Sequence, residues 1–228
     1  FPELSVTGYE GGARFAQMAQ RVPGAVTNIL GQHATDFGVY VLIGMAVKED
    51  VETVLYNGAV LIAPDGEVAG TYRKVHLPAE ERLSFRPGYQ IKPIETEVGI
   101  LGVMTGWDLT FPEMARSLML SGAEIILLPA AWQVKDVDMW RTLLVARAYE
   151  NDIFIAAANR IGEEPSYAFA GQSAVLSPAG EVLAALEEPE EGYVVVRLDL
   201  DEVRHRREES QIMLARQPNS YRPIVRKY

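Results

Sequence analysis

The chain has 228 residues with 31 acidic and 21 basic side chains, so its formal charge is -10 at pH 7, and its length suits one domain with a sizeable core. This acidic balance excludes nucleic acid or an anionic membrane as the main partner, because a phosphate-binding surface must be basic. The absence of cysteine excludes disulfides, thiolate metal sites and thiol catalysis by the chain as it stands.

Short apolar segments rich in Val and Ile recur along the chain. Such segments predict strands that are buried on both faces of a sheet. They cover residues 39–47, 54–62, 99–104, 124–130 and 152–159.

Helix signals lie between the later strands. Thr110 is expected as an N-cap, with Pro112 in the first turn and Gly122 as the stop. A second helix is expected from Asp138, before the apolar spacing that begins at Trp140. Strands that alternate with helices predict an α/β fold.

Two stretches of the chain resemble each other. Residues 59–68 (AVLIAPDGEV) and 174–182 (AVLSPAGEV) each combine a strand, a Pro-x-Gly turn and a return strand. The FPE tripeptide also occurs twice, at residues 1–3 and 111–113. These echoes favour a layered sandwich built from two similar halves.

No widespread catalytic motif is present in the sequence. His33, His76 and His205 are too scattered for a metal motif, and the chain has neither a Walker loop nor a G-x-S-x-G elbow. Lys74, at the end of a predicted strand, is either a surface lysine or an ammonium that stabilises an oxyanion. Glu3 and Glu81 in isolation look like acids in loops.

Three longer stretches are informative when they are considered together. FPELSVTGY, YRKVHLPAEERLSFRPG and GVMTGWDLTFPEMARSLMLSGAEIILLPAAW, in this order, resemble the nitrilase superfamily of carbon-nitrogen hydrolases. The resemblance continues through WRTLLVARAYENDIFIAAANRIG and FAGQSAVLSP to RQPNSYRP, and thus covers nearly the whole chain.

The resemblance implies a four-layer αββα sandwich, usually dimeric or larger, that hydrolyses amides, carbamoyl compounds or nitriles without a metal or other cofactor. It places the catalytic base on Glu3, the oxyanion-stabilising lysine on Lys74 and a second glutamate on Glu81. The position of the nucleophilic cysteine falls on Gly106. Around these residues we expect a linked hydrogen-bonded set with a void at the missing side chain.

Gly106 has two interpretations. It is either a glycine that a sharp turn requires for positive φ, or the replacement of a lost nucleophile, natural or engineered. Thr105 should not substitute, because side chains alternate along a strand. Loss of a nucleophile from a coupled catalytic set costs about 10⁶ in turnover, so we expect the chain to be inactive or nearly so.

Binding residues are expected beside this turn. The Trp107 N–H is implied as an oxyanion donor, while Trp132 and Asn159 follow strands at the edge where α/β sheets bind ligands. Trp132 is equally compatible with a core role, and Tyr9, Tyr56 and Tyr167 are weaker candidates.

The start of the chain departs from the family pattern. Family members usually carry a strand and a helix before the FPE segment, so we expect that the single domain at residues 1–228 is either truncated at its N-terminus or has an incomplete core. Its apolar runs are shorter than the ~18 residues of a membrane helix, and no signal peptide is evident, so we expect a cytoplasmic protein.

The sequence thus predicts a Glu–Lys–Cys type hydrolase of small amides or carbamoyl compounds that is inactive as written, and a homodimer or larger homo-oligomer. The alternative is a cysteine-less pseudoenzyme that binds a metabolite or serves in assembly.

Overall fold

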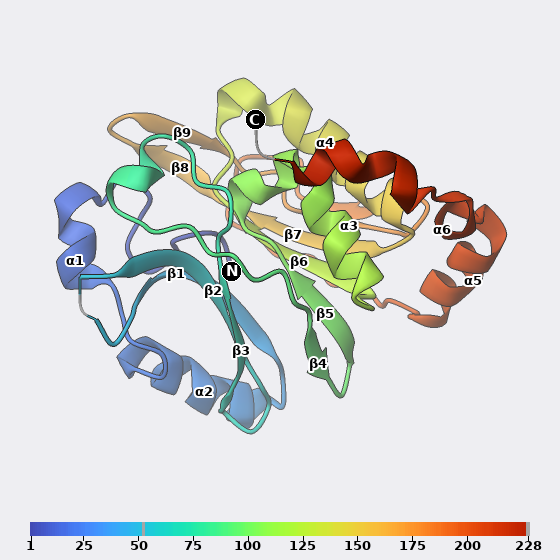
Figure 1. Ribbon diagram of the computed structural model, residues 1–228. Coiled ribbons are helices and arrows are strands. Elements are labelled where there is room, and N and C mark those ends of the chain that lie inside the picture. The colour runs from blue at the N-terminus through green and yellow to red at the C-terminus, as the bar shows by residue number, and fades with distance from the viewer. Residues whose placement is uncertain (52, 227–228) are drawn as a thin grey trace.

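The computed structural model describes residues 1–51 and 53–226, so residues 52, 227 and 228 of the predicted domain lie outside the described residues. The chain forms four layers in the order helix, sheet, sheet, helix (Figure 1). The predicted αββα sandwich is confirmed. Among the described residues, no helix is both long enough and apolar enough to cross a bilayer.

The first sheet has the order β1-β2-β3 and is antiparallel throughout. Its strands are β1 (Val41–Lys48), β2 (Leu55–Ile62) and β3 (Val68–Arg73). Helix α2 (Ala25–Phe37) packs against this sheet, and β1 contacts β6 of the second sheet. Nearly every residue of β2 is therefore buried.

The second sheet has the order β11-β10-β7-β6-β5-β4. Strands β5, β6 and β7 are parallel, while β4, β10 and β11 run antiparallel to their neighbours. Their bounds are β4 (Ile94–Thr96), β5 (Gly99–Val103), β6 (Ile125–Ala130), β7 (Phe154–Asn159), β10 (Ala174–Leu176) and β11 (Val182–Ala185). A separate hairpin joins β8 (Ile161–Glu164) to β9 (Tyr167–Ala170).

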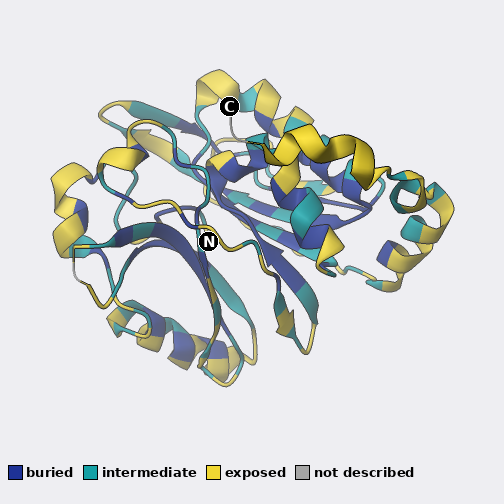
Figure 2. Cartoon of the chain, viewed as in Figure 1, coloured by how far each residue is buried: buried dark blue, intermediate teal, exposed yellow. Residues whose placement is uncertain are grey.

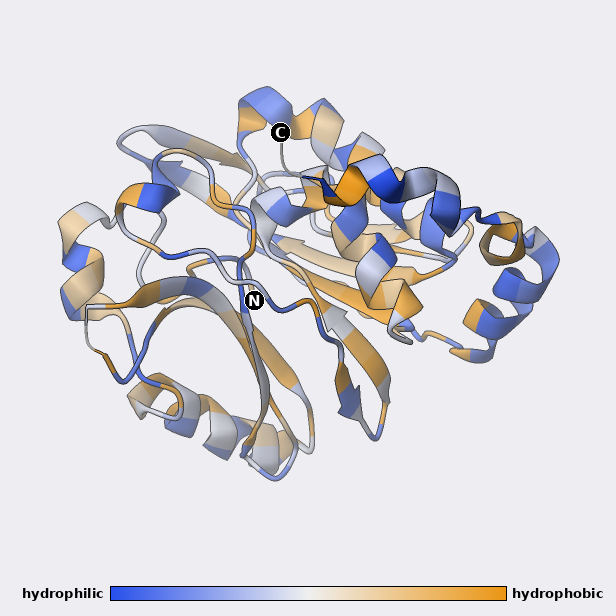
Figure 3. Cartoon of the chain, in the orientation of Figure 1, coloured by the Kyte–Doolittle hydropathy of each residue, from blue (hydrophilic) through white to orange (hydrophobic). Residues whose placement is uncertain are grey.

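Helices α3 (Pro112–Leu120) and α4 (Val137–Asn151) cover the outer face of the second sheet. Buried apolar side chains of both helices form one core with the strands. Figures 2 and 3 show the central strands of both sheets as buried and apolar, whereas α5 (Asp201–Ser210) is mostly exposed and polar. The remaining helices are α1 (Phe15–Met18), α6 (Ile212–Ala215) and 3₁₀ turns at Gly12–Arg14, Glu81–Leu83, Gly106–Thr110, Val134–Asp136 and Pro218–Val225.

The five predicted strands correspond to β1, β2, β5, β6 and β7. The two similar stretches do form antiparallel hairpins, β2–β3 and β10–β11, each with a register shift.

The predicted N-cap at Thr110 is wrong, because Phe111 precedes Pro112 in that position. Thr110 instead ends a 3₁₀ helix, and its carbonyl accepts a hydrogen bond from Arg147. Helix α4 begins at Val137, one residue before Asp138.

Candidate active site

Glu3 lies between the two sheets. Its neighbour Ser5 donates its backbone N–H to Gly44 O on β1 at 2.8 Å. A Cβ on Gly44 would stand 2.6 Å from the Cα of Glu3, so only glycine admits this close approach. The N–H of Glu3 reaches Ala130 O at the end of β6 at 3.4 Å, and its side chain is buried.

Lys74 joins two carboxylates. It follows β3, and its Nζ lies 2.6 Å from Glu3 Oε1 and 2.6 Å from Glu81 Oε1. All three side chains are at most 5% exposed. Buried charges are tolerated when they are paired and hydrogen-bonded, so these three residues depend on one another.

Two neutral side chains complete the charged set. Asn57 on β2 donates its Nδ2 to Glu3 Oε1 at 2.7 Å and to Glu81 Oε2 at 3.0 Å. The hydroxyl of Tyr9 donates to Glu81 Oε1 at 2.6 Å. Asn57 was missed by the sequence analysis, although a polar residue inside an apolar strand was a visible signal.

Burial and charge shift the ionisation of this set. Burial raises the pKa of Glu3 from 4.5 to about 7, against the attraction of Lys74 and with the help of Glu81. Burial lowers the pKa of Lys74, but Glu3 and Glu81 outweigh this effect and leave it raised. Burial, then Glu3 and Glu81, raise the pKa of Tyr9, so its hydroxyl stays a donor.

Gly106 begins a 3₁₀ turn just after β5 and has φ +49°, a left-handed conformation that favours glycine. The turn is held by Asp108, whose side chain is fully buried. Asp108 accepts hydrogen bonds from the Tyr72 hydroxyl at 2.6 Å, the His76 N–H at 2.9 Å and the Thr105 N–H at 3.1 Å.

The expected void beside Gly106 is not present. A Cβ built on Gly106 would overlap Oε2 of Glu3 and would lie 2.9 Å from its Cδ. The carboxylate of Glu3 therefore occupies the space that a side chain on Gly106 would need.

A pocket of about 610 Å³ opens over Gly106. Glu3 and Lys74 lie in its wall together with the aromatic residues Tyr9, Trp107, Trp132 and Tyr167, and with Glu80, Lys135 and Asp136 among its further lining residues. Trp132 is fixed by a hydrogen bond of 3.2 Å from its Nε1 to Gly106 O.

Asn159 and Glu81 are not among the residues that line this pocket. The Oδ1 of Asn159 accepts from the Trp132 N–H at 2.7 Å, and its Nδ2 donates to Gly171 O at 2.6 Å. Asn159 thus lies behind Trp132 and holds its backbone.

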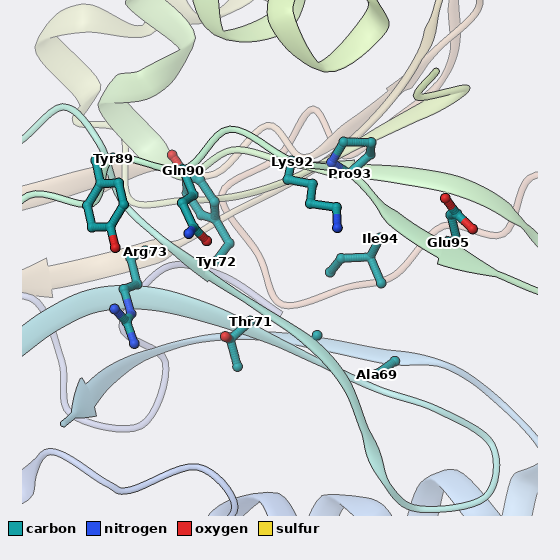
Figure 4. A pocket seen from close by; sticks show the side chains of 11 residues that line it. Ala69, Thr71, Tyr72, Arg73, Tyr89, Gln90, Lys92, Pro93, Ile94 and Glu95 are labelled. Atoms are coloured by element: carbon teal, nitrogen blue, oxygen red, sulfur yellow. The ribbon is translucent and has the colours of Figure 1, made fainter. Parts of the chain in front are cut away.

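A second pocket, of about 630 Å³, lies between β3 and residues 89–95 (Figure 4). Arg73 forms an ion pair with Glu49 and stacks over Tyr56, and Lys92 is exposed. This pocket contains neither Gly106 nor the charged set. Within the part of the chain that the structure describes, no group of three His, Asp or Glu side chains could hold a metal ion.

Comparison with known proteins decides the family. A model of the carbon-nitrogen hydrolases matches residues 1–208. The chain belongs to the carbon-nitrogen hydrolase family. A nitrilase from Pyrococcus abyssi is 39% identical to it over 210 residues, which cover 90% of this chain and 78% of that protein.

Solved structures of carbon-nitrogen hydrolases share the fold. The enzyme from Helicobacter pylori G27 superposes with a TM-score of 0.85 at 29% identity, covering 89% of this chain and 76% of its own. A glutamate-to-glutamine mutant of the amidase from Nesterenkonia sp. AN1 has a TM-score of 0.79 at 32% identity, with 92% and 80% covered. That mutant shows covalent addition of the acetamide moiety of fluoroacetamide at its active-site cysteine.

Proposed function

We propose that the chain binds small amides or carbamoyl compounds in the pocket over Gly106, and that it lacks the nucleophile for their hydrolysis by a Glu–Lys–Cys route. The observation that carries the proposal is the contact of Glu3, Lys74 and Glu81 directly beside a turn whose first residue is glycine.

Two donors are available for a substrate carbonyl oxygen. An ammonium has three protons, and the Nζ of Lys74 uses two of them on Glu3 and Glu81. The third is free to point into the pocket that Lys74 lines. Trp107 is the second residue of the 3₁₀ turn, so its N–H has no acceptor within that turn. These donors suit an oxyanion.

No side chain beside Glu3 supplies a nucleophile in this proposal. Gly106 has no reactive atom, and the hydroxyl of Thr105 is fully buried outside the pocket lining. In a site with cysteine, Glu3 would take the thiol proton and later protonate the leaving amine. Without the thiol, the expected loss in amide turnover is about 10⁶.

Calorimetry with butyramide and with N-carbamoyl compounds tests the binding site. We expect heat of binding for at least one primary amide, and its loss in Lys74→Ala. The matched control is Lys92→Ala, which removes an exposed lysine in the second pocket and should bind as the unaltered chain does. No heat with any amide in the folded, unaltered chain would refute the proposed function.

A role in assembly is the second candidate. Val145 and Tyr149 lie one turn apart on α4 and are exposed despite their apolar character. The turn at Gly180 packs against Val145 and Tyr149, and the exposed Val182 of β11 lines a pocket together with Val145. Adjoining exposed apolar side chains of this kind favour a protein interface, and we propose that two copies of the chain pair here.

A further inference from the structure

The Glu3 carboxylate has one anchored oxygen and one free oxygen. Oε1 accepts from Lys74 at 2.6 Å and from Asn57 at 2.7 Å. Both of these hydrogen bonds involve Oε1, and within residues 1–51 and 53–226 no hydrogen bond to Oε2 is found. Oε2 is the atom that a Cβ on Gly106 would overlap. A carboxylate oxygen therefore occupies space that the first side-chain atom on Gly106 would need.

We propose that the unaltered chain hydrolyses small aryl esters without a protein nucleophile, with Glu3 as the general base for a water molecule that attacks the ester directly. Ester hydrolysis would take place in the same pocket as amide binding. This inference rests on the proposed function only in that the same groups place the carbonyl group of the ligand. It involves no acyl-enzyme.

The chemical step balances without a further reactant. A water oxygen bonds to the ester carbonyl carbon while one of its protons passes to Glu3 Oε2, and the carbonyl electron pair moves onto oxygen. Lys74 Nζ and the Trp107 N–H hold this oxyanion. When the intermediate collapses, the bond from carbon to the aryl oxygen breaks, and the phenolate accepts the proton from Glu3. The products are a carboxylic acid and a phenol.

Esters with good leaving groups suit this site better than amides do. An amine leaves only after its nitrogen is protonated, whereas a phenolate leaves readily as an anion. General-base catalysis contributes about 10²–10⁴-fold, and one oxyanion donor about 10²–10³-fold. The pocket of about 610 Å³ has room for an aryl acetate beside a water molecule, which takes about 30 Å³ in the liquid.

The titratable groups that face Glu3 determine the pH range in which its carboxylate can act as a base. They are Lys74, Glu81, Tyr9 and Tyr72, which come from separate segments of the chain. With the pKa of Glu3 raised by burial to about 7, its carboxylate is ionised above neutral pH yet basic enough to accept a proton from water. The rate should rise with pH around the pKa of Glu3 and level off about one pH unit above it.

Steady-state hydrolysis of 4-nitrophenyl acetate tests the proposal. We expect turnover at least about 10³-fold above the solvent rate, and a fall of about 10²-fold or more in Glu3→Gln, because general-base catalysis contributes about 10²–10⁴-fold. Histidines are common surface catalysts of this ester, so the matched control is the double variant His33→Gln, His205→Gln, which removes two exposed imidazoles and should keep the full rate. Equal rates for Glu3→Gln and the unaltered chain would overturn the proposal.

A second variant covers the case in which Glu3→Gln does not fold. Gly106→Ala adds no reactive atom, but its Cβ must displace Glu3 Oε2, so it should lower the ester rate at least 10-fold. An unchanged rate in folded Gly106→Ala would also overturn the proposal.

Hydrolysis in ¹⁸O-labelled water separates this route from direct attack by the carboxylate. Attack by Glu3 itself would form a mixed anhydride. Mass spectrometry would then detect either the acyl group on the Glu3 peptide or, where water opens the anhydride at the glutamyl carbonyl, the label in that peptide, and either result would refute the general-base route. We expect no label there. If the unaltered chain binds amides but hydrolyses no ester, only this inference is refuted. If it binds no amide, the proposed function is refuted.

Discussion

Glu3 and Gly106 meet between the two sheets, where the carboxylate of Glu3 fills the space that a Cβ on Gly106 would need. Glu3 lies beside β1 of the first sheet, and Gly106 follows β5 of the second. The contact therefore depends on how the two sheets pack, and β1 contacts β6 directly. A side chain introduced at position 106 would therefore displace the Glu3 carboxylate and change its ionisation.

The stability of the chain should depend on pH through Glu3. Its pKa is raised from 4.5 to about 7, so between these values the folded state binds more protons than the unfolded state. The Glu3 contribution to the free energy of unfolding should consequently fall as pH rises from about 4.5 to about 7, by about 3 kcal/mol, and stay level above. Denaturant titrations of the unaltered chain and of Glu3→Gln should show this difference. Parallel pH profiles for the two would contradict it.

Lys74→Met should destabilise the fold strongly. It leaves two buried carboxylates without their cation, and breaking a buried ion pair in this way costs about 3–5 kcal/mol. The control is Lys92→Met, an exposed lysine that should change the free energy of unfolding by less than about 0.5 kcal/mol. Urea unfolding measures both, and a loss below 1 kcal/mol for Lys74→Met would count against the observed ion pairs.

Asn57→Leu should also destabilise the chain, because one side chain amide serves both carboxylates. Hydrogen bonds to charged groups contribute about 1.5–3 kcal/mol each, so we expect a loss of at least 2 kcal/mol. Asn28→Leu, at an exposed position of α2, is the matched substitution and should be close to neutral. Similar unfolding curves for the two variants would show that Asn57 does not hold the set together.

The outward face of α4 should carry a dimer contact. Light scattering of the 25.2 kDa chain should show a particle about twice that mass at micromolar concentration. Tyr149→Glu should shift it to the monomer, because a charge would be buried in an apolar interface. Helix α3 is a less suitable surface for a dimer contact, because most of its apolar side chains already pack inward. A monomeric unaltered chain would exclude the contact.

The sequence indicated candidate site residues but not their arrangement. Glu3, Lys74 and Glu81 became candidates only through the resemblance to a family, since Glu3 and Glu81 in isolation look like acids in loops. The turn at Gly106 could be recognised from the strand and helix around it. The two hydrogen bonds of Asn57 could not be predicted, because they join β2 to residues 1–5 and to the turn at Glu81, which are distant from β2 in the sequence. Asn159 was correctly placed at a strand end, but which way its amide points depends on Trp132 and Gly171.

The absence of the expected void beside Gly106 has a similar explanation. Removing a side chain from a motif suggests empty space, yet the neighbouring carboxylate has a free oxygen that can take its place. Interiors are packed at high density, so small gaps tend to be filled by flexible neighbours. Only the packing of both sheets reveals which neighbour does so.

The rate of amide hydrolysis by Gly106→Cys tests the account most directly. The new side chain must displace Glu3 Oε2 and adopt positive φ, so we expect a loss in stability of about 1 kcal/mol or more. It should nevertheless place a thiol beside Glu3, Lys74 and the Trp107 N–H.

We predict that Gly106→Cys hydrolyses a primary amide that the unaltered chain only binds, and that an acyl adduct on the cysteine is visible by mass spectrometry. Adding Glu3→Gln or Lys74→Ala to this variant should abolish the activity, because each removes a different part of the mechanism. A folded Gly106→Cys variant that forms no adduct and hydrolyses no amide would contradict the account, and so would amide turnover by the unaltered chain.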